Sequence, residues 1–230
     1  MCGRFTLSAP GDALAEVFEL DDVPEAVPRY NIAPTQPVLV VRARGPRRVA
    51  ETLAWGVLFP AKGGRRSPLL INARAETLGT QPAWREALSE RRCLIPADGF
   101  YEWHGEGDAR QPWYIARGDG RPFAFAGVWQ PQFGPDGKAA CTIVTTAPLP
   151  PVSAIHDRMP LLVSPDEHAL WLDRQAPRDA IARLLRTPPR ADALVAHPVG
   201  RAVNSAKNDD PSLREPAAAA ASGPRQRGLF

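Results

Sequence analysis

Cysteine, lysine and long apolar runs are scarce in this sequence of 230 residues, and each scarcity excludes a class of protein. The 3 cysteines, Cys2, Cys93 and Cys141, are odd in number and have no CxxC spacing, which argues against a disulfide framework and against a zinc finger. No run approaches the ~20 apolar residues of a membrane span, and the first residues lack the apolar stretch of a signal peptide. We therefore expect a soluble, cytoplasmic protein with no membrane partner.

Several common catalytic motifs are also missing. The sequence contains no GxxxxGK[ST], GxGxxG or GxSxG, which argues against nucleotide-hydrolysing, dinucleotide-binding and α/β-hydrolase proteins. The 4 histidines show neither HxxxH nor HxH spacing. We therefore expect neither a metal nor an organic cofactor.

The charge balance leaves the partner open. Basic residues number 28, of which only three are lysines, and acidic residues number 25, so the formal net charge is +3. An ordinary solvated surface fits this small excess as well as a polyanion partner does. The segment 42–66, however, holds seven basic residues and one acidic residue, which makes it the candidate for contact with a polyanion.

Proline and glycine limit long helices, because together they supply 44 of the 230 residues. Alternating and β-branched runs predict strands, and apolar residues at helical spacing predict short helices. The predicted strands are 37–42, 48–55, 93–95, 113–116, 123–129 and 140–146, and the predicted helices are 10–20, 82–88, 165–172 and 177–185. This order predicts an α+β fold with a largely antiparallel sheet in one domain over residues 2–215. Residues 216–230 are expected to form a disordered tail.

Cys2 is unusual in its position. A residue so near the start has little chain before it that could bury it, so we expect an accessible thiol, although cysteine is more often a small buried hydrophobic residue. Removal of Met1 would leave a thiol and an α-amine on one residue, with pKa values near 8.5 and 8. An aldehyde would form an imine with the amine, and the thiol would then close a thiazolidine ring. A structural cysteine and self-cleavage to an N-terminal nucleophile remain alternatives.

Three further clusters carry reactive groups, and each has a plainer interpretation. In an extended segment 71–77, Asn72, Arg74 and Glu76 would share one side, as on a solvated strand edge. Glu102 lies between two aromatic residues that could desolvate it for acid/base use, or it is a surface residue of a strand whose aromatic neighbours pack inward. His156 could move a proton and Arg158 could hold a phosphate, or His156 is structural.

These clusters together resemble the SOS response-associated peptidase (SRAP) family of abasic-site processing proteins. Six motifs occur in the family's order, and a set of this kind is far more specific than any one of them. The matching motifs are Met1-Cys2-Gly3-Arg4-Phe5, Tyr30-Asn31-Ile32-Ala33-Pro34-Thr35, Trp55-Gly56, Ile71-Asn72-Ala73-Arg74-Ala75-Glu76-Thr77, the segment from Arg92 to Trp103, and His156-Asp157-Arg158-Met159-Pro160. The segment that follows Trp55-Gly56 departs from the family's usual pattern of large aromatic residues.

The resemblance implies a single SRAP-like domain with a strongly twisted, barrel-like sheet core and peripheral short helices. It implies covalent capture of abasic sites in single-stranded DNA, a lyase-like and slowly self-reversing activity. Cys2 would be the nucleophile, Asn72 would orient the N-terminus and Glu102 would act as general acid/base. His156 would protonate, or donate a hydrogen bond to, the sugar hydroxyl released on ring opening. The residues expected to contact DNA are Arg4, Arg74, Arg158, Thr145, Trp103 and Phe59.

Two other functions stay open at this point. One is proteolysis, either removal of the protein's own leading residue or a general cysteine-type peptidase activity, as the family name proposes. The other is non-covalent binding of single-stranded DNA with an inert Cys2. On the leading interpretation the partners are abasic single-stranded DNA and the replication-fork or SOS-response machinery. The protein would act as a monomer, associated with the nucleoid when bound to DNA.

Overall fold

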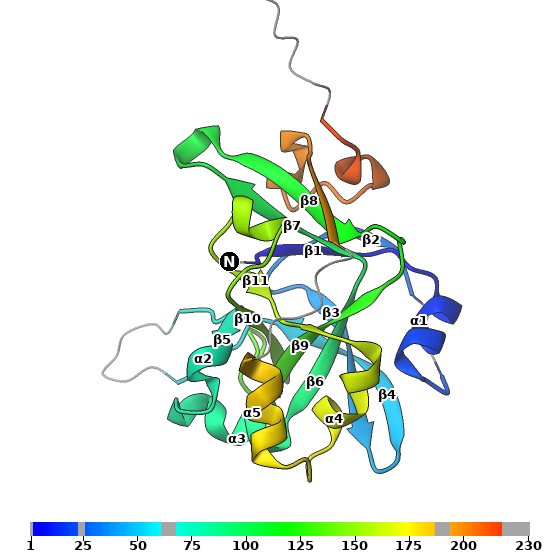
Figure 1. Cartoon of the computed structure of the whole chain (residues 1–230), viewed down its shortest axis with the longest axis vertical. Helices are drawn as coiled ribbons and strands as arrows, with labels where there is room; N and C mark the ends of the chain where they lie inside the picture. Colours follow the sequence, from blue (N-terminus) through cyan, green and yellow to red (C-terminus); the bar gives the residue numbers. More distant parts are fainter. Residues whose placement is uncertain (1, 23–25, 61–67, 187–193, 218–230) are drawn as a thin grey trace, which may run out of the picture.

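The computed structural model describes residues 2–22, 26–60, 68–186 and 194–217. Two β-sheets form the centre of the molecule, and short helices lie around them (Figure 1). The α+β class and the predominantly antiparallel pairing expected from the sequence are confirmed. Within the described part of the chain, every helix is too short or too polar to cross a membrane.

The first sheet holds the N-terminal strand as an inner strand, next to the edge. All of its strands pair antiparallel in the order β13-β8-β7-β1-β2. These strands are β1 (Arg4–Leu7), β2 (Arg29–Ile32), β7 (Gly99–His104), β8 (Gln111–Arg117) and β13 (Leu194–Pro198). Because β1 is flanked on both sides, the chain that leads into it is held close to the sheet.

The second sheet closes on itself. Its order is β11-β10-β4-β3-β6-β9-β12, β5 is added to β10, and a further pairing of β10 with β9 completes a ring. The strands are β3 (Pro37–Arg44), β4 (Arg47–Trp55), β5 (Asn72–Arg74), β6 (Arg92–Ala97), β9 (Phe123–Gln130), β10 (Ala140–Thr146), β11 (Met159–Pro160) and β12 (Leu162–Val163). This ring is the barrel-like core that the resemblance implies.

The helices are short and lie at the periphery (Figure 1). They are α1 (Gly11–Phe18), α2 (Ala75–Leu78), α3 (Pro82–Glu90), α4 (His168–Leu172) and α5 (Arg178–Arg186), with 3-10 turns at Gly107–Ala109, Val152–Ala154, Pro165–Glu167, Arg201–Asn204 and Pro211–Arg214. Each of the four predicted helices is present. The predicted 165–172 helix divides into a 3-10 turn followed by α4.

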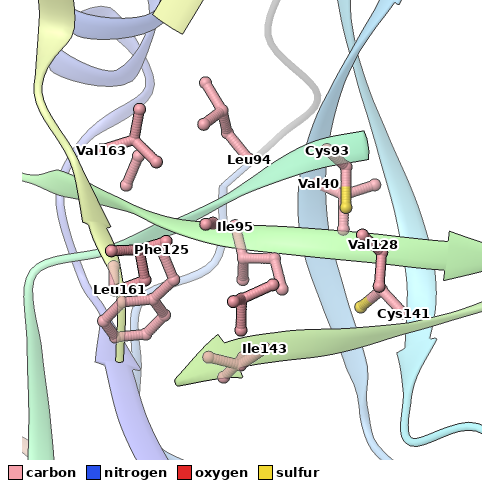
Figure 2. Close-up of a cluster of buried hydrophobic side chains, with 14 of the residues drawn as sticks. Val40, Cys93, Leu94, Ile95, Phe125, Val128, Cys141, Ile143, Leu161 and Val163 are labelled. Atoms are coloured by element: carbon pink, nitrogen blue, oxygen red, sulfur yellow. The ribbon is translucent and has the colours of Figure 1, made fainter. Parts of the chain in front are cut away.

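Apolar side chains from β3, β6, β9 and β10 fill the ring (Figure 2). Val40, Ile95, Phe125 and Ile143 are fully buried there. Burial of side chains of this size contributes roughly 1.5–3 kcal/mol each, which makes the ring the main source of stability. A smaller cluster around Tyr101, Tyr114, Val199, Val203 and Leu213 covers the other face of the five-stranded sheet.

A close approach joins β7 to β8, and hydrogen bonds beside it hold β1. A Cβ atom on Gly99 would lie 2.1 Å from the hydroxyl oxygen of Tyr114, so only glycine fits at this position. Beside it, the carboxylate of Asp98 accepts hydrogen bonds from the Thr6 hydroxyl and from the backbone N–H and hydroxyl of Ser8. The Asp98-Gly99 pair therefore holds the strand that follows Cys2.

Two sequence-based expectations need correction. Segment 71–77 is extended only as far as Arg74, after which α2 begins, so Glu76 lies on a helix and not on the same strand face as Asn72. The basic segment also forms ion pairs. Arg42 and Arg44 pair with Glu51, Arg47 with Asp21 and Asp22, and Arg48 with Glu19.

Glu19, Asp21 and Asp22 lie outside 42–66, so these ion pairs offset the charge excess of its described part, 42–60. The remaining basic residues of 42–66, Lys62, Arg65 and Arg66, lie outside the described residues. The domain bounds 2–215 stay a prediction. The first residue of the expected tail, Pro216, forms an isolated bridge with Val199, and residues 218–230 lie outside the described part.

Candidate active site

Cys2 lies where β1 meets β7. Arg4 is opposite Tyr101 in the antiparallel register, so the chain just before β1 runs beside Glu102. The Cys2 side chain is fully buried, and its Sγ–H donates to the carbonyl oxygen of Arg4 at 3.8 Å. The expectation of an accessible thiol is therefore wrong. Burial, and then the negative charge of Glu102, raise the pKa of the Cys2 thiol well above its ordinary value.

Glu102 is the buried carboxyl group of this site. Its side chain comes from β7 and the residue is only 1% exposed, so the interpretation of Glu102 as a surface residue is wrong. Burial raises its pKa to about 7. A carboxyl group that titrates near neutral pH can both donate and accept a proton under ordinary conditions.

His156 faces Glu102 from the loop that precedes β11. Its Nε2 lies 3.9 Å from Oε2 of Glu102, and its Nδ1 accepts the backbone N–H of Arg158 at 2.9 Å. In the neutral imidazole the Arg158 N–H favours a ring proton on Nε2, on the side of Glu102, whereas the Asp157 carboxylate favours one on Nδ1. Burial lowers the pKa of His156, and Asp157, whose Oδ1 is 2.9 Å from Nδ1, opposes that shift.

Asn72 joins the second sheet to the N-terminal residue. It lies on β5, opposite Ile143 of β10, and its Nδ2 donates a 2.9 Å hydrogen bond to the carbonyl oxygen of Cys2. Its Oδ1 is buried and accepts no hydrogen bond from any residue that the structure describes. A buried acceptor of this kind is available to an N–H donor brought into the site.

Arg158 is engaged with protein groups. Its guanidinium donates to both carboxylate oxygens of Glu76, at 2.6 and 2.9 Å. The same side chain donates to the carbonyl and hydroxyl oxygens of Thr145, at 2.6 and 3.3 Å. Thr145 is opposite Arg74 on β5 and Pro160 on β11, so the strand register brings Arg74, Thr145 and Arg158 together. Arg74 is exposed, and its guanidinium makes no hydrogen bond or ion pair with the described residues.

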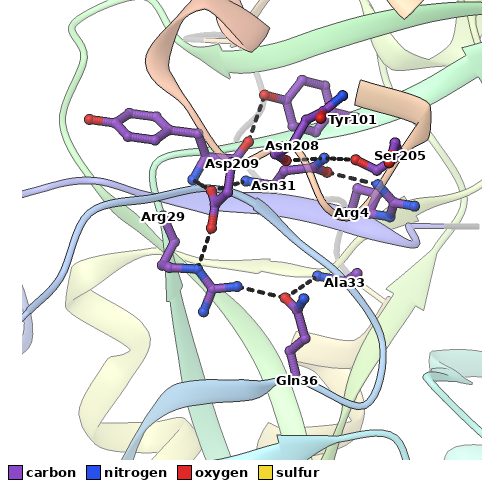
Figure 3. A network of polar contacts seen from close by, with 10 residues as sticks. Arg4, Arg29, Asn31, Ala33, Gln36, Tyr101, Ser205, Asn208 and Asp209 are labelled. Atoms are coloured by element: carbon purple, nitrogen blue, oxygen red, sulfur yellow. Dashed lines mark hydrogen bonds and ion pairs between the residues drawn. The ribbon is translucent and has the colours of Figure 1, made fainter. Parts of the chain in front are cut away.

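Arg4 belongs to a polar network that includes the C-terminal segment (Figure 3). Its guanidinium donates to Oδ1 of Asn31 at 2.9 Å and to the carbonyl oxygens of Val203 and Asn204 at 2.7 and 3.2 Å. Asn31 is fully buried and donates in turn to the carbonyl oxygens of Val203, Ser205 and Asn208. Asn31 belongs to one of the six motifs of the sequence, yet the motif alone does not indicate this role.

The two predicted aromatic contacts differ in their surroundings. The indole N–H of Trp103 donates to Oδ1 of Asn204 at 2.8 Å, and Trp103 lines an open cavity of about 410 Å³ with Gly107, Arg110 and Asn204. Phe59 instead packs against Trp84 and Phe133, with ring centroids 4.9 and 5.3 Å apart. None of the described hydrogen bonds, ion pairs or ring contacts joins Phe59 to Cys2.

No group of three or more potential metal ligands occurs among the residues that the structure describes. The donors that the site does offer are a thiol, an amide, a carboxyl group and an imidazole, with arginines beside them. This set is suited to proton transfer and to covalent attack on a carbonyl carbon next to an anionic group.

Comparisons with known proteins agree on one family. The sequence model of the SOS response associated peptidase (SRAP) family matches residues 1–206. Abasic site processing protein YoqW of Bacillus subtilis is 38% identical over 222 residues, which covers 94% of this chain and 99% of the relative. Abasic site processing protein YedK of Escherichia coli is 34% identical over 224 residues, which covers 94% and 100%.

Solved structures show the same fold. A Bacteroides thetaiotaomicron protein superposes with a TM-score of 0.78 at 22% identity and covers 94% of this chain and 100% of its own. A phage-related protein from Bordetella bronchiseptica superposes with a TM-score of 0.71 at 28% identity and covers 87% and 95%.

Proposed function

Because the chain belongs to the SOS response associated peptidase family, we propose that it recognises abasic sites in single-stranded DNA and joins to them covalently through Cys2. The names of its relatives support the substrate. The observation that carries the chemistry is the meeting of four groups from separate elements. Asn72 bonds the Cys2 carbonyl, Glu102 acts electrostatically on the Cys2 thiol, and His156 faces Glu102.

The reaction requires removal of Met1, which leaves the α-amine on Cys2. The open-chain form of an abasic sugar is an aldehyde. The amine nitrogen attacks the aldehyde carbon, the oxygen leaves as water after protonation, and an imine forms. Sγ then adds to the same carbon, and the thiol proton passes to the nitrogen. One water is released in total, and its addition in the reverse direction frees the DNA.

Glu102 moves protons in this scheme. With a pKa of about 7 it is present in both forms at neutral pH. The acid form protonates the departing hydroxyl during imine formation, and the carboxylate form accepts the thiol proton before Sγ attacks. The second role matters because burial keeps the Cys2 thiol protonated.

Asn72 and His156 form hydrogen bonds with groups next to the reacting atoms. The amide of Asn72 holds the Cys2 carbonyl, and its buried Oδ1 is an acceptor for the α-amine or for the ring nitrogen. In the tautomer with its proton on Nε2, which the Arg158 N–H favours, His156 is a donor for the sugar oxygen released on ring opening.

Arg74, Thr145 and Arg158 form the surface on which we place the phosphates beside the lesion. Arg4 contributes by holding the strand that follows Cys2, since its donors bond protein carbonyls. Trp103 supplies a face for a neighbouring base, a contact worth roughly 1–3 kcal/mol.

The geometry favours this chemistry over a cysteine peptidase. A thiol peptidase needs a thiolate with a lowered pKa, paired with an imidazolium. Here the pKa of the thiol is raised and that of His156 is lowered, and the imidazole faces a carboxyl group. Attack by the amine, with the thiol second, does not need a thiolate at the start.

The test is incubation of Met1-processed protein with a single strand that carries one abasic site. We expect a shifted band that survives heating in denaturant. A variant with extra residues before Cys2 keeps the thiol and loses the α-amine, so it should bind DNA and give no such band. An extended variant that crosslinks as well as the processed protein would overturn the thiazolidine proposal.

A further inference from the structure

The two side chains of the Glu76–Arg158 pair lie at different depths. The Glu76 side chain is 51% exposed, whereas that of Arg158 is 15% exposed. The carboxylate therefore lies on the solvent side of the guanidinium. An anion that approaches Arg158 from solution meets Glu76 first.

Glu76 also fills the face of Arg158 that suits a phosphate. It accepts from Nη1 and Nη2 through its two oxygens, the bidentate geometry in which arginine binds phosphate. The hydrogen bonds from Arg158 lower the pKa of Glu76, so the carboxylate is charged at neutral pH.

Arg158 would keep its place without Glu76. Its Nη2 also donates to the carbonyl and hydroxyl oxygens of Thr145, a buried residue of β10. Thr145 lies between β5 and β11 in the sheet, so this anchor is part of the folded core. Loss of the carboxylate would therefore leave an oriented guanidinium with a vacant bidentate edge.

We propose that Glu76 is a specificity-determining residue, an internal anion that occupies the phosphate site of Arg158 and so weakens non-covalent binding to undamaged single strands. This rests on the proposed function, since it takes the Arg74–Thr145–Arg158 surface as the DNA contact. A phosphate binds Arg158 only when it displaces the carboxylate, and this cost is the same on intact and damaged DNA. Only the abasic strand offsets the cost of displacing Glu76, because it alone forms a covalent bond with Cys2.

The experiment compares Glu76→Gln with the wild type on an intact single-stranded oligonucleotide that has no aldehyde. Glutamine is nearly isosteric and removes the charge. We expect roughly fivefold tighter binding at low salt, the size that an ion pair of this exposure allows. The plot of log affinity against log salt should also steepen by about 0.7, the value for one added phosphate contact on a single strand.

A matched control is Glu86→Gln on α3. Glu86 pairs with Arg91 at 2.6 Å, their side chains are 73% and 15% exposed, and the substitution changes the net charge equally. Equal gains in both variants, or weaker binding by Glu76→Gln, would overturn the proposal. If Glu76→Gln unfolds at a lower temperature than the wild type, Glu76→Ala is compared with Glu86→Ala, since this pair of variants also removes one negative charge from each ion pair.

A second measurement separates this inference from the proposed function. Crosslinking to an abasic strand is measured with a rising excess of intact competitor. With the abasic strand kept well below the concentration that half-saturates either protein, the Glu76→Gln variant should lose half of its yield at about fivefold less competitor than the wild type. Equal sensitivity overturns the role of Glu76 and leaves the covalent proposal intact, whereas no crosslink by either protein overturns the proposed function itself.

Discussion

The side-chain amide of Asn72 donates a 2.9 Å hydrogen bond to the carbonyl oxygen of Cys2, a residue 70 positions earlier in the chain. This bond ties the end of one sheet to an added strand of the other. It holds Cys2, which carries both proposed nucleophiles, through its carbonyl oxygen. The bond does not involve the backbone nitrogen or Sγ of Cys2.

Replacement of Asn72 by alanine should slow adduct formation about tenfold, equivalent to about 1.4 kcal/mol, because a hydrogen bond to the Cys2 backbone is lost. Affinity for intact single strands should stay unchanged. The rate is measured from the heat-stable band over time. Asn208→Ala is the control, since it removes a 2.8 Å bond to the Ala202 carbonyl. Equal rates in the wild type and Asn72→Ala would remove Asn72 from the reaction.

Glu102→Gln should change the dependence of the rate on pH. In the wild type, the acid form that protonates the departing hydroxyl disappears as pH rises through about 7. The α-amine, with a pKa near 8, loses its proton over the same range in both proteins. The ratio of wild-type to variant rate cancels that contribution. We expect this ratio to fall between pH 6 and 8, and a constant ratio would exclude Glu102 as the acid.

Asn31→Ala should destabilise the protein by about 3 kcal/mol, since Arg4 and three carbonyl groups lose their partner in a buried place. Asn31→Asp keeps the acceptor for Arg4 but sets a carboxylate against carbonyl oxygens, so it should be at least as damaging. Urea unfolding measures both variants. A loss below about 1 kcal/mol in Asn31→Ala would show that the network contributes little to stability.

The buried His168 should lower the free energy of unfolding in mild acid. Burial, and then the positive charge of Arg48, lower its pKa to about 4 in the folded chain, against an ordinary value of 6.5. Between these values the unfolded chain takes up the proton and the folded chain does not, so the free energy of unfolding falls as pH drops from 6.5 to 4. The loss is at most about 3 kcal/mol and levels off below pH 4.

His168→Phe is the matched test, because it keeps the ring that stacks on Phe18 at 5.3 Å and removes the titrating group. Its stability, followed by urea unfolding at several pH values, should depend less on pH between 6.5 and 4. The same substitution at the exposed His104 is the control. An unchanged pH dependence in His168→Phe would assign the acid sensitivity to other groups.

The long strands could be predicted from the sequence because their own residues specify them. Ala140–Thr146 has the predicted bounds, and the β3–β4 hairpin turns at Gly45, where φ is +60°. Strands β11 and β12 have two residues each, so they owe their existence to partners on β10 and β9 and leave no pattern of their own.

The candidate site was predicted as residue types, and its geometry was not. Motifs pointed to Cys2, Asn72, Glu102 and His156, but the burial of Cys2 depends on chain segments far from position 2. In the same way, the acidic residues that neutralise Arg47 and Arg48 lie in the segment after α1, outside the basic segment 42–66. The burial of Cys2 and the neutralisation of these arginines both depend on contacts between distant segments of the chain.

The bonds from Arg4 to Val203 and Asn204 also impose an order on biosynthesis. Val203 follows Arg4 by 199 residues, and ribosomes add about 5–20 residues per second, so Arg4 waits about 10 to 40 seconds for these partners. Asn72 likewise emerges well after Cys2. The start of the nascent chain therefore lacks these partners during synthesis, so the proposed removal of Met1 can precede completion of the fold.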